Sequence, residues 1–170
     1  MVNKKAEGPI GMSFSMIFSI ILIIFFLIVA FIAIKSFLST KDCAQVGIFI
    51  NDFQTEVDNA WASQKNRYEF STVLPTDVEY ICFGDFSKPL TGPHKDIGED
   101  LSVYEGTNDN MFFYPRTSAC EMSTKKILHI NLVEMISTEN PYCIAVTGGR
   151  FKANIEKVFN KNLVKVSRLS

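Results

Sequence analysis

Residues 16–34 read MIFSIILIIFFLIVAFIAI, a stretch in which Ser19 is the only polar residue. As an α-helix rising ~1.5 Å per residue, this stretch is about 28 Å long, which matches the hydrocarbon core of a bilayer. It is longer than the apolar core of a signal peptide, and no A-x-A cleavage pattern follows it. We therefore predict a retained transmembrane helix over residues 16–38, with residues 1–15 before it as a short leader.

Charged residues and cysteines on either side of this segment predict its orientation. Lys4 and Lys5 precede it, and Lys35 and Lys41 follow it, so the positive-inside rule gives a cytoplasmic leader a small preference. All four cysteines follow the segment, and none forms the C-x-x-C pair of zinc sites and redox motifs. Because disulfides form in oxidising compartments, we expect residues 67–170 to form an extracytoplasmic domain.

We interpret the four cysteines as two disulfides that staple this domain, and independently buried thiols are the alternative. Four cysteines allow three pairings, which the sequence alone does not resolve. The preferred pairing joins Cys82 to Cys143, because both lie in apolar, strand-like runs, and it leaves Cys43 with Cys120. Each bridge would contribute ~2–4 kcal/mol to stability.

The chain after the apolar segment predicts an amphipathic helix over residues 39–66. No proline occurs in this stretch or in the apolar segment, so the transmembrane helix can continue into it. Alternatively, Ser39, Thr40 and Asp42 cap a second helix after a short break. The apolar residues recur at the spacing of one buried helix face. They are Val46, Phe49, Ile50, Phe53, Val57, Ala60 and Trp61.

Beyond this helix, aromatic and β-branched residues are interrupted by prolines, which predicts short strands. The run 78–83 is apolar on both faces, as in a central strand, and Gly148-Gly149 predicts the turn of a hairpin. The predicted strands are residues 78–83, 111–114, 127–133, 142–147, 150–156 and 163–167, with loops at 88–98 and 105–110. The predicted fold class is therefore α+β, with the amphipathic helix packed on a mainly antiparallel β-sheet.

No catalytic or metal-binding motif accompanies these elements in the sequence. His94 lies in a proline-glycine loop, and His129 lies in a predicted strand without an acidic partner at metal-ligand spacing, so we interpret both as structural. Gly148-Gly149 lacks the surroundings of a phosphate-binding loop. We interpret Trp61 and residues 111–114 as core residues rather than as an exposed ligand platform. The sequence therefore predicts neither an enzyme nor a cofactor.

The formal net charge of −1 gives no electrostatic reason to expect binding to nucleic acid. Charge is uneven along the chain, because residues 96–109 are acidic and the last twenty residues are basic. The basic residues, which face only Glu156 in that stretch, are Lys152, Lys157, Lys161, Lys165 and Arg168. Solvated faces and head-to-tail contact between copies both explain this pattern, and the sequence does not choose between them.

A basic leader with Lys4 and Lys5, a small residue at Ala6 and a polar joint at Glu7-Gly8 precede the hydrophobic helix, the amphipathic helix and the β-rich domain. This order resembles that of archaeal type IV pilin-like proteins. The resemblance implies that a prepilin peptidase cuts the leader within Lys4, Lys5, Ala6, Glu7 and Gly8. The anchor pattern MxFxMIFSIxLIIxFxxxAFxAIKxFL is also similar to that of uncharacterised single-span archaeal membrane proteins, and this similarity implies no activity.

These observations predict a single-pass membrane protein whose extracytoplasmic domain has a structural or protein-binding role. A pilin-like subunit of a surface filament is the alternative. The expected partners are the lipid bilayer and either another protein or a second copy of the chain. Loss of the leader distinguishes the two readings, because a filament core made of packed helices has no room for charged leaders.

Overall fold

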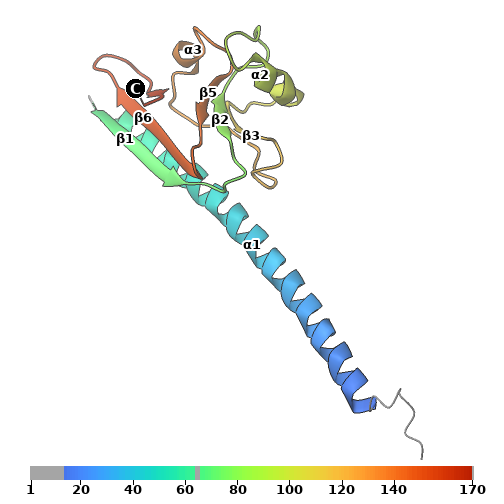
Figure 1. Ribbon diagram of the computed structural model, residues 1–170. Helices are drawn as coiled ribbons and strands as arrows, with labels where there is room; N and C mark the ends of the chain where they lie inside the picture. Colours follow the sequence, from blue (N-terminus) through green and yellow to red (C-terminus); the bar gives the residue numbers. More distant parts are fainter. Residues whose placement is uncertain (1–13, 64–65, 170) are drawn as a thin grey trace, which may run out of the picture. The chain divides into compact units, whose positions relative to one another are not determined.

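The structure, a computed structural model, describes residues 14–63 and 66–169 of the chain (Figure 1). It divides into two units, which meet between Thr40 and Lys41. The fold is α+β, with a long apolar N-terminal helix and antiparallel sheets. Helix α1 (Phe14–Ala62) passes through the boundary without a break, so the alternative of a separately capped second helix is wrong. It ends before residue 66, the predicted limit, because strand β1 begins there.

The first unit contains the apolar part of α1. All side chains from residue 15 to residue 38 are exposed, which is the arrangement that a surrounding apolar phase would favour. Within the described residues, this is the helix that is long and apolar enough to cross a membrane. Ser19 is the one polar residue of the stretch 16–34, and its Oγ donates a hydrogen bond of 2.8 Å to the carbonyl of Ser15 one turn earlier.

The second unit contains two antiparallel sheets and three short helices (Figure 1). Sheet A has the strand order β1 (Asn66–Val73), β6 (Arg150–Lys157) and β7 (Lys165–Ser167). Sheet B has the order β4 (Thr124–Lys125), β3 (Met111–Tyr114), β2 (Tyr80–Phe83) and β5 (Tyr142–Ala145). The helices are α2 (Lys95–Leu101), the 3-10 helix η1 (Ser102–Tyr104) and α3 (Leu132–Met135).

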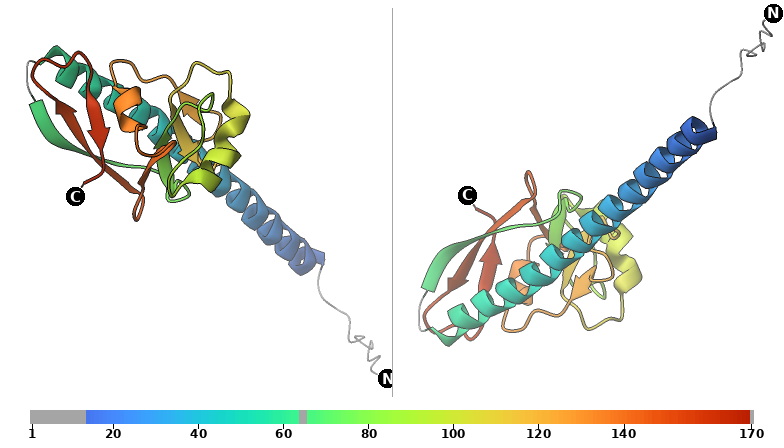
Figure 2. Two further views of the ribbon diagram at one scale, coloured as in Figure 1. Left: turned by 90° about the horizontal axis from the view of Figure 1, so that it is seen from above. Right: turned by 90° about the horizontal axis from the view of Figure 1, so that it is seen from below.

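An aromatic core joins α1 to both sheets, and the two views of Figure 2 show the C-terminal half of α1 beside their strands. The ring of Phe49 lies 5.3 Å from that of Phe151 in sheet A and 5.6 Å from that of Phe113 in sheet B. The ring of Phe53 lies 5.9 Å from that of Phe83. The buried residues on α1 are Val46, Phe49, Ile50, Phe53, Val57 and Ala60.

Sheet B is covered on its second face by α2. Cys82, Leu101, Phe112 and Cys143 form a smaller buried cluster there. Strand β2 therefore lies between β3 and β5 and is buried on both faces, as its apolar sequence predicted.

The predicted hairpin of residues 142–147 and 150–156 is wrong, although its turn is formed. Thr147 and Arg150 exchange two backbone hydrogen bonds of 3.1 Å around the two glycines, both of which have positive φ. Strand β5 then pairs with β2 in sheet B, whereas β6 pairs with β1 in sheet A. The turn is thus a corner between the two sheets. A hydrogen bond holds it beside β1, because the backbone N–H of Leu74 donates to the carbonyl of Gly149 at 2.8 Å.

The predicted strand at residues 127–133 is also wrong. His129 adopts a positive φ of 63°, which interrupts an extended chain. Asn131 then caps α3, because its side-chain oxygen accepts from the backbone N–H of Glu134. Ile130 alone forms an isolated β-bridge.

The predicted loop 88–98 ends inside a helix, since α2 begins at Lys95. Gly98 weakens the helical signal in the sequence, but packing explains the glycine there. A Cβ at this position would lie 2.7 Å from Pro141 and 3.0 Å from Leu90. The other predictions fit better, because residues 105–110 form turns and the last strand is present as β7.

Candidate functional site

Both predicted disulfides are present, and they account for all four cysteines. Cys82 and Cys143 stand directly opposite each other on β2 and β5, and both are buried. This bridge therefore links two neighbouring strands within sheet B.

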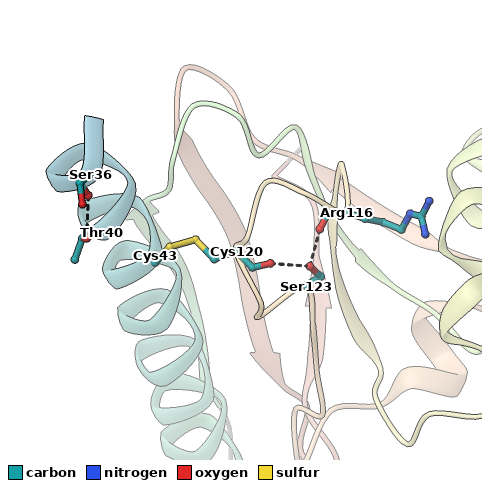
Figure 3. Close-up of a disulfide and its surroundings, with 6 residues drawn as sticks. All are labelled: Ser36, Thr40, Cys43, Arg116, Cys120 and Ser123. Carbon is teal, nitrogen blue, oxygen red and sulfur yellow. Dashed lines mark hydrogen bonds between the residues drawn. A yellow bond between two sulfur atoms is a disulfide. The ribbon is translucent and has the colours of Figure 1, made fainter. Parts of the chain in front are cut away.

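The second disulfide joins Cys43 on α1 to Cys120, 77 positions further along the chain (Figure 3). Cys120 lies in a loop and has a positive φ of 54°. Ser123 holds this loop, because its Oγ lies 2.6 Å from the carbonyl oxygen of Arg116 and 3.4 Å from that of Cys120 (Figure 3). The bridge thus attaches α1 to a loop whose conformation is also held by hydrogen bonds within the loop.

A polar and aromatic cluster surrounds the C-terminal end of α1. His129 Nδ1 lies 2.8 Å from Asp58 Oδ1, and the imidazole stacks on the indole of Trp61 with ring centres 3.9 Å apart. Trp61 Nε1 donates to the carbonyl of Asn162 at 3.0 Å. The Trp61 side chain is nevertheless 42% exposed, so its interpretation as a core residue is wrong. The acidic partner of His129 was not visible in the sequence, because the two residues are 71 positions apart.

Exposed apolar side chains lie on the segments that make or adjoin these contacts, and we call them together the Trp61 patch. It comprises Trp61, Leu128, Phe159 and Leu163. Leu128 precedes the stacked histidine, Leu163 follows the residue that binds the indole, and Phe159 belongs to the same connection between β6 and β7. Exposed large apolar residues that lie on neighbouring segments are candidates for an interaction surface.

A second cluster fixes the end of β7 against sheet B through Arg168. Its Nη1 lies 2.7 Å from Glu139 Oε1, its Nε donates to the carbonyl of Cys143 at 2.8 Å, and its guanidinium lies over the ring of Tyr142. The Glu139 side chain is only 9% exposed, so this carboxylate depends on its partner. His94 Nδ1 lies 3.7 Å from Glu139 Oε2 and has no hydrogen-bond partner in the described part of the chain.

A cavity of about 290 Å³ opens at the end of sheet B where Phe83 pairs with Met111. Antiparallel pairing brings together residues 84–87, which follow β2, and residues 104–110, which precede β3. Strand prediction could have located this site, because it fixes which connecting segments share one end of a sheet.

The cavity has a polar rim of mixed charge. A hydrogen bond from Ser87, 2.6 Å long, lowers the pKa of Asp85 below its ordinary value and keeps this carboxyl ionised. Lys126 also lines the cavity, and its Nζ lies 3.3 Å from Asn108 Oδ1. Donors and acceptors therefore both face the space.

The partly buried hydroxyl of Tyr68 ties α1 to sheet A. Tyr68 Oη lies 2.6 Å from the carbonyl oxygen and 2.9 Å from the carboxylate of Glu56. Burial, followed by this hydrogen bond, raises the pKa of Tyr68 well above its ordinary value. The hydroxyl consequently remains a donor at every physiological pH.

Most basic residues near the C-terminus have partners inside the domain. The pairs are Lys152–Glu69 (3.4 Å), Lys165–Glu134 (3.3 Å) and Arg168–Glu139 (2.7 Å). Three of the five basic residues in this run therefore have an acidic partner within the second unit. In the acidic run, Glu99 pairs with Lys95 at 3.7 Å.

The leader residues Lys4, Lys5, Ala6, Glu7 and Gly8 lie outside the described residues. Within residues 14–63 and 66–169, no group of three histidine, cysteine, aspartate or glutamate side chains is placed to hold a metal ion. Comparisons with protein-family models, curated proteins and solved structures found no match to this chain.

Proposed function

We propose that the chain is a single-pass membrane protein, with its N-terminus in the cytoplasm, whose second unit lies outside the cytoplasm and binds another protein. The apolar part of α1 supports the anchor, because its exposed side chains have the length and composition of a membrane span. The two disulfides support an oxidising compartment for the second unit.

The Trp61 patch is the observation that carries the binding role. Trp61 and Phe159 are 42% and 61% exposed, and aromatic residues are enriched in protein–protein interfaces. The indole is held in place by stacking and by a hydrogen bond, so little side-chain freedom is lost when a partner covers it. We propose that the patch binds an apolar surface of a different protein.

The topology predicts which lysines react from outside the cell. A membrane-impermeant amine reagent applied to intact cells will label Lys95, whose side chain is 59% exposed. Lys4 and Lys5 will be labelled only after the membrane is permeabilised. Peptide mass spectrometry measures both, and labelling of the leader but not of Lys95 in intact cells contradicts the proposed orientation.

The binding role predicts contact at one side of the second unit. A photo-crosslinking residue at position 159 will form an adduct in native membranes, whereas the same residue at position 103 will not. The two positions are matched, because Phe159 and Val103 are each 61% exposed. One heterologous adduct supports the tethered binding domain, and a ladder of multiples of the chain's own mass supports self-assembly. Equal adducts at both positions contradict a role for the patch.

A pilin-like filament subunit is the second candidate. The unbroken course of α1 from Phe14 to Ala62 supports it, since such subunits first hold an apolar helix in the membrane and later pack it against others. Two features of the sequence rank it second, namely Pro9 near the expected cut and the lack of glutamate in the apolar run. The tethered domain predicts an intact mass that includes Lys4 and Lys5. Loss of the leader from protein purified from its native membrane would reverse this ranking.

A further inference from the structure

The cavity at the end of sheet B has an aromatic wall. The ring centre of Phe112 lies 4.7 Å from that of Phe86 and 5.9 Å from that of Tyr104. Phe112 is buried, whereas Phe86 and Tyr104 are half-buried and line the space. Aromatic rings at the wall of a cavity offer an apolar surface to the C–H groups of a ligand.

The polar residues that line the same cavity retain hydrogen-bonding capacity. Thr124 donates to Asp109 Oδ2, and Lys126 donates to Asn108 Oδ1. Asn108 Nδ2 and Asp109 Oδ1 have no protein partner among the described residues, so one donor and one acceptor are available side by side.

The charges around the cavity select among ligand classes. Asp85, Glu105 and Asp109 outnumber Lys126, which disfavours phosphate and other anions. Lys126, which lines the same cavity, disfavours a compact cation. A neutral ligand that carries both donors and acceptors and also has an apolar face suits the free donor and acceptor as well as the aromatic rings.

We propose that this cavity binds one saccharide unit. The half-buried rings of Phe86 and Tyr104 contact the C–H face of the sugar, and Asn108 and Asp109 hydrogen bond to its hydroxyl groups, which both donate and accept. A volume of about 290 Å³ is small for a ligand site, which suits a single sugar rather than the middle of a chain. The inference does not rest on the membrane topology, and it gives the domain a glycan as a further binding partner.

The test uses the full-length, ¹⁵N-labelled protein in detergent micelles. D-glucose, D-galactose, D-mannose and N-acetylglucosamine are titrated separately to about 10 mM, which detects a Kd near 1 mM. At least one sugar will shift the amide signals of Phe86, Asn108 and Asp109. If none of the four sugars shifts these signals, the proposal is overturned.

Variants locate the binding and separate it from folding. Tyr104→Ala will weaken binding about tenfold or more, whereas Tyr104→Phe, which keeps the ring, will bind within about twofold of the original chain. Val103→Ala is the neighbouring control, because this side chain is exposed and does not line the cavity. Asn108→Ala removes an exposed group with one hydrogen bond, so it tests the rim in a folded protein. Unchanged affinity in both alanine variants, Tyr104→Ala and Asn108→Ala, places binding elsewhere and overturns the proposal.

Methyl glycosides of the sugar that binds distinguish the end of a glycan chain from a free monosaccharide. A methyl glycoside that binds as well as the free sugar shows that the anomeric oxygen points out of the cavity, as the end of a glycan chain requires. A methyl glycoside that binds about tenfold more weakly assigns the cavity to a free monosaccharide.

Discussion

Replacing Phe49 by alanine will lower the free energy of unfolding of the second unit by about 3–5 kcal/mol. Phe49 is completely buried and contacts the rings of Phe53, Phe70, Phe113 and Phe151, so its removal leaves a cavity where α1 meets both sheets. The loss is large because neither sheet can move into the space without disturbing the other.

Guanidinium denaturation of the full-length protein in detergent micelles measures this effect. Trp61 is the single tryptophan, and its stacking on His129 makes its fluorescence a reporter of the folded state. Ile48→Ala is the control, since Ile48 is the adjacent residue on the same helix and is 57% exposed. Equal midpoints for the two variants would contradict the placement of Phe49 at the centre of the core.

Removing the bridge between Cys43 and Cys120 by a double substitution to serine will cost about 4 kcal/mol. The reason is the entropy of the unfolded chain, because the disulfide closes a long loop, with the two cysteines 77 positions apart. The double substitution leaves no single thiol to form wrong pairs. The same denaturation experiment measures the difference under oxidising conditions.

A reductant provides the control for this experiment. When both proteins are fully reduced, the unsubstituted chain loses the same constraint, and its unfolding midpoint should fall to that of the double variant. If the two proteins are equally stable under oxidising conditions, the bridge does not stabilise the domain.

Local patterns in the sequence predicted the elements that depend on local physics. The apolar run at residues 16–34 and the spacing of Phe49, Phe53 and Val57 need no knowledge of the rest of the chain, because helix geometry fixes which side chains share a face. The strand at residues 78–83 was predicted from an equally local signal, namely a run that is apolar on both faces. Strand β1 was not predicted, although the alternation of Tyr68 and Phe70 against Arg67 and Glu69 is an equally local signal for it.

Features that depend on distant partners were missed. The Gly148-Gly149 turn has a hairpin sequence, and only the pairing of β6 with β1 assigns its two arms to different sheets. His129 lies in an alternating apolar run, yet contacts with Trp61 and Asp58 hold it at a positive φ that ends the run. The cavity rim likewise combines Asp85 with Asn108, which the sequence places in separate loops.

The pairing of β1 with β6 sets the order in which this domain can mature during synthesis. Residues 66–73 leave the ribosome before residues 74–149, which separate them from their partner strand β6. Synthesis of that intervening stretch takes several seconds at ~5–20 residues per second. During that interval, Phe49, Phe53 and Phe70 have no Phe151 to cover them. A nascent chain that stops before Arg150 therefore holds an anchor and an uncovered aromatic surface, and the arrival of β6 is the event that turns the emerging polypeptide into a folded domain.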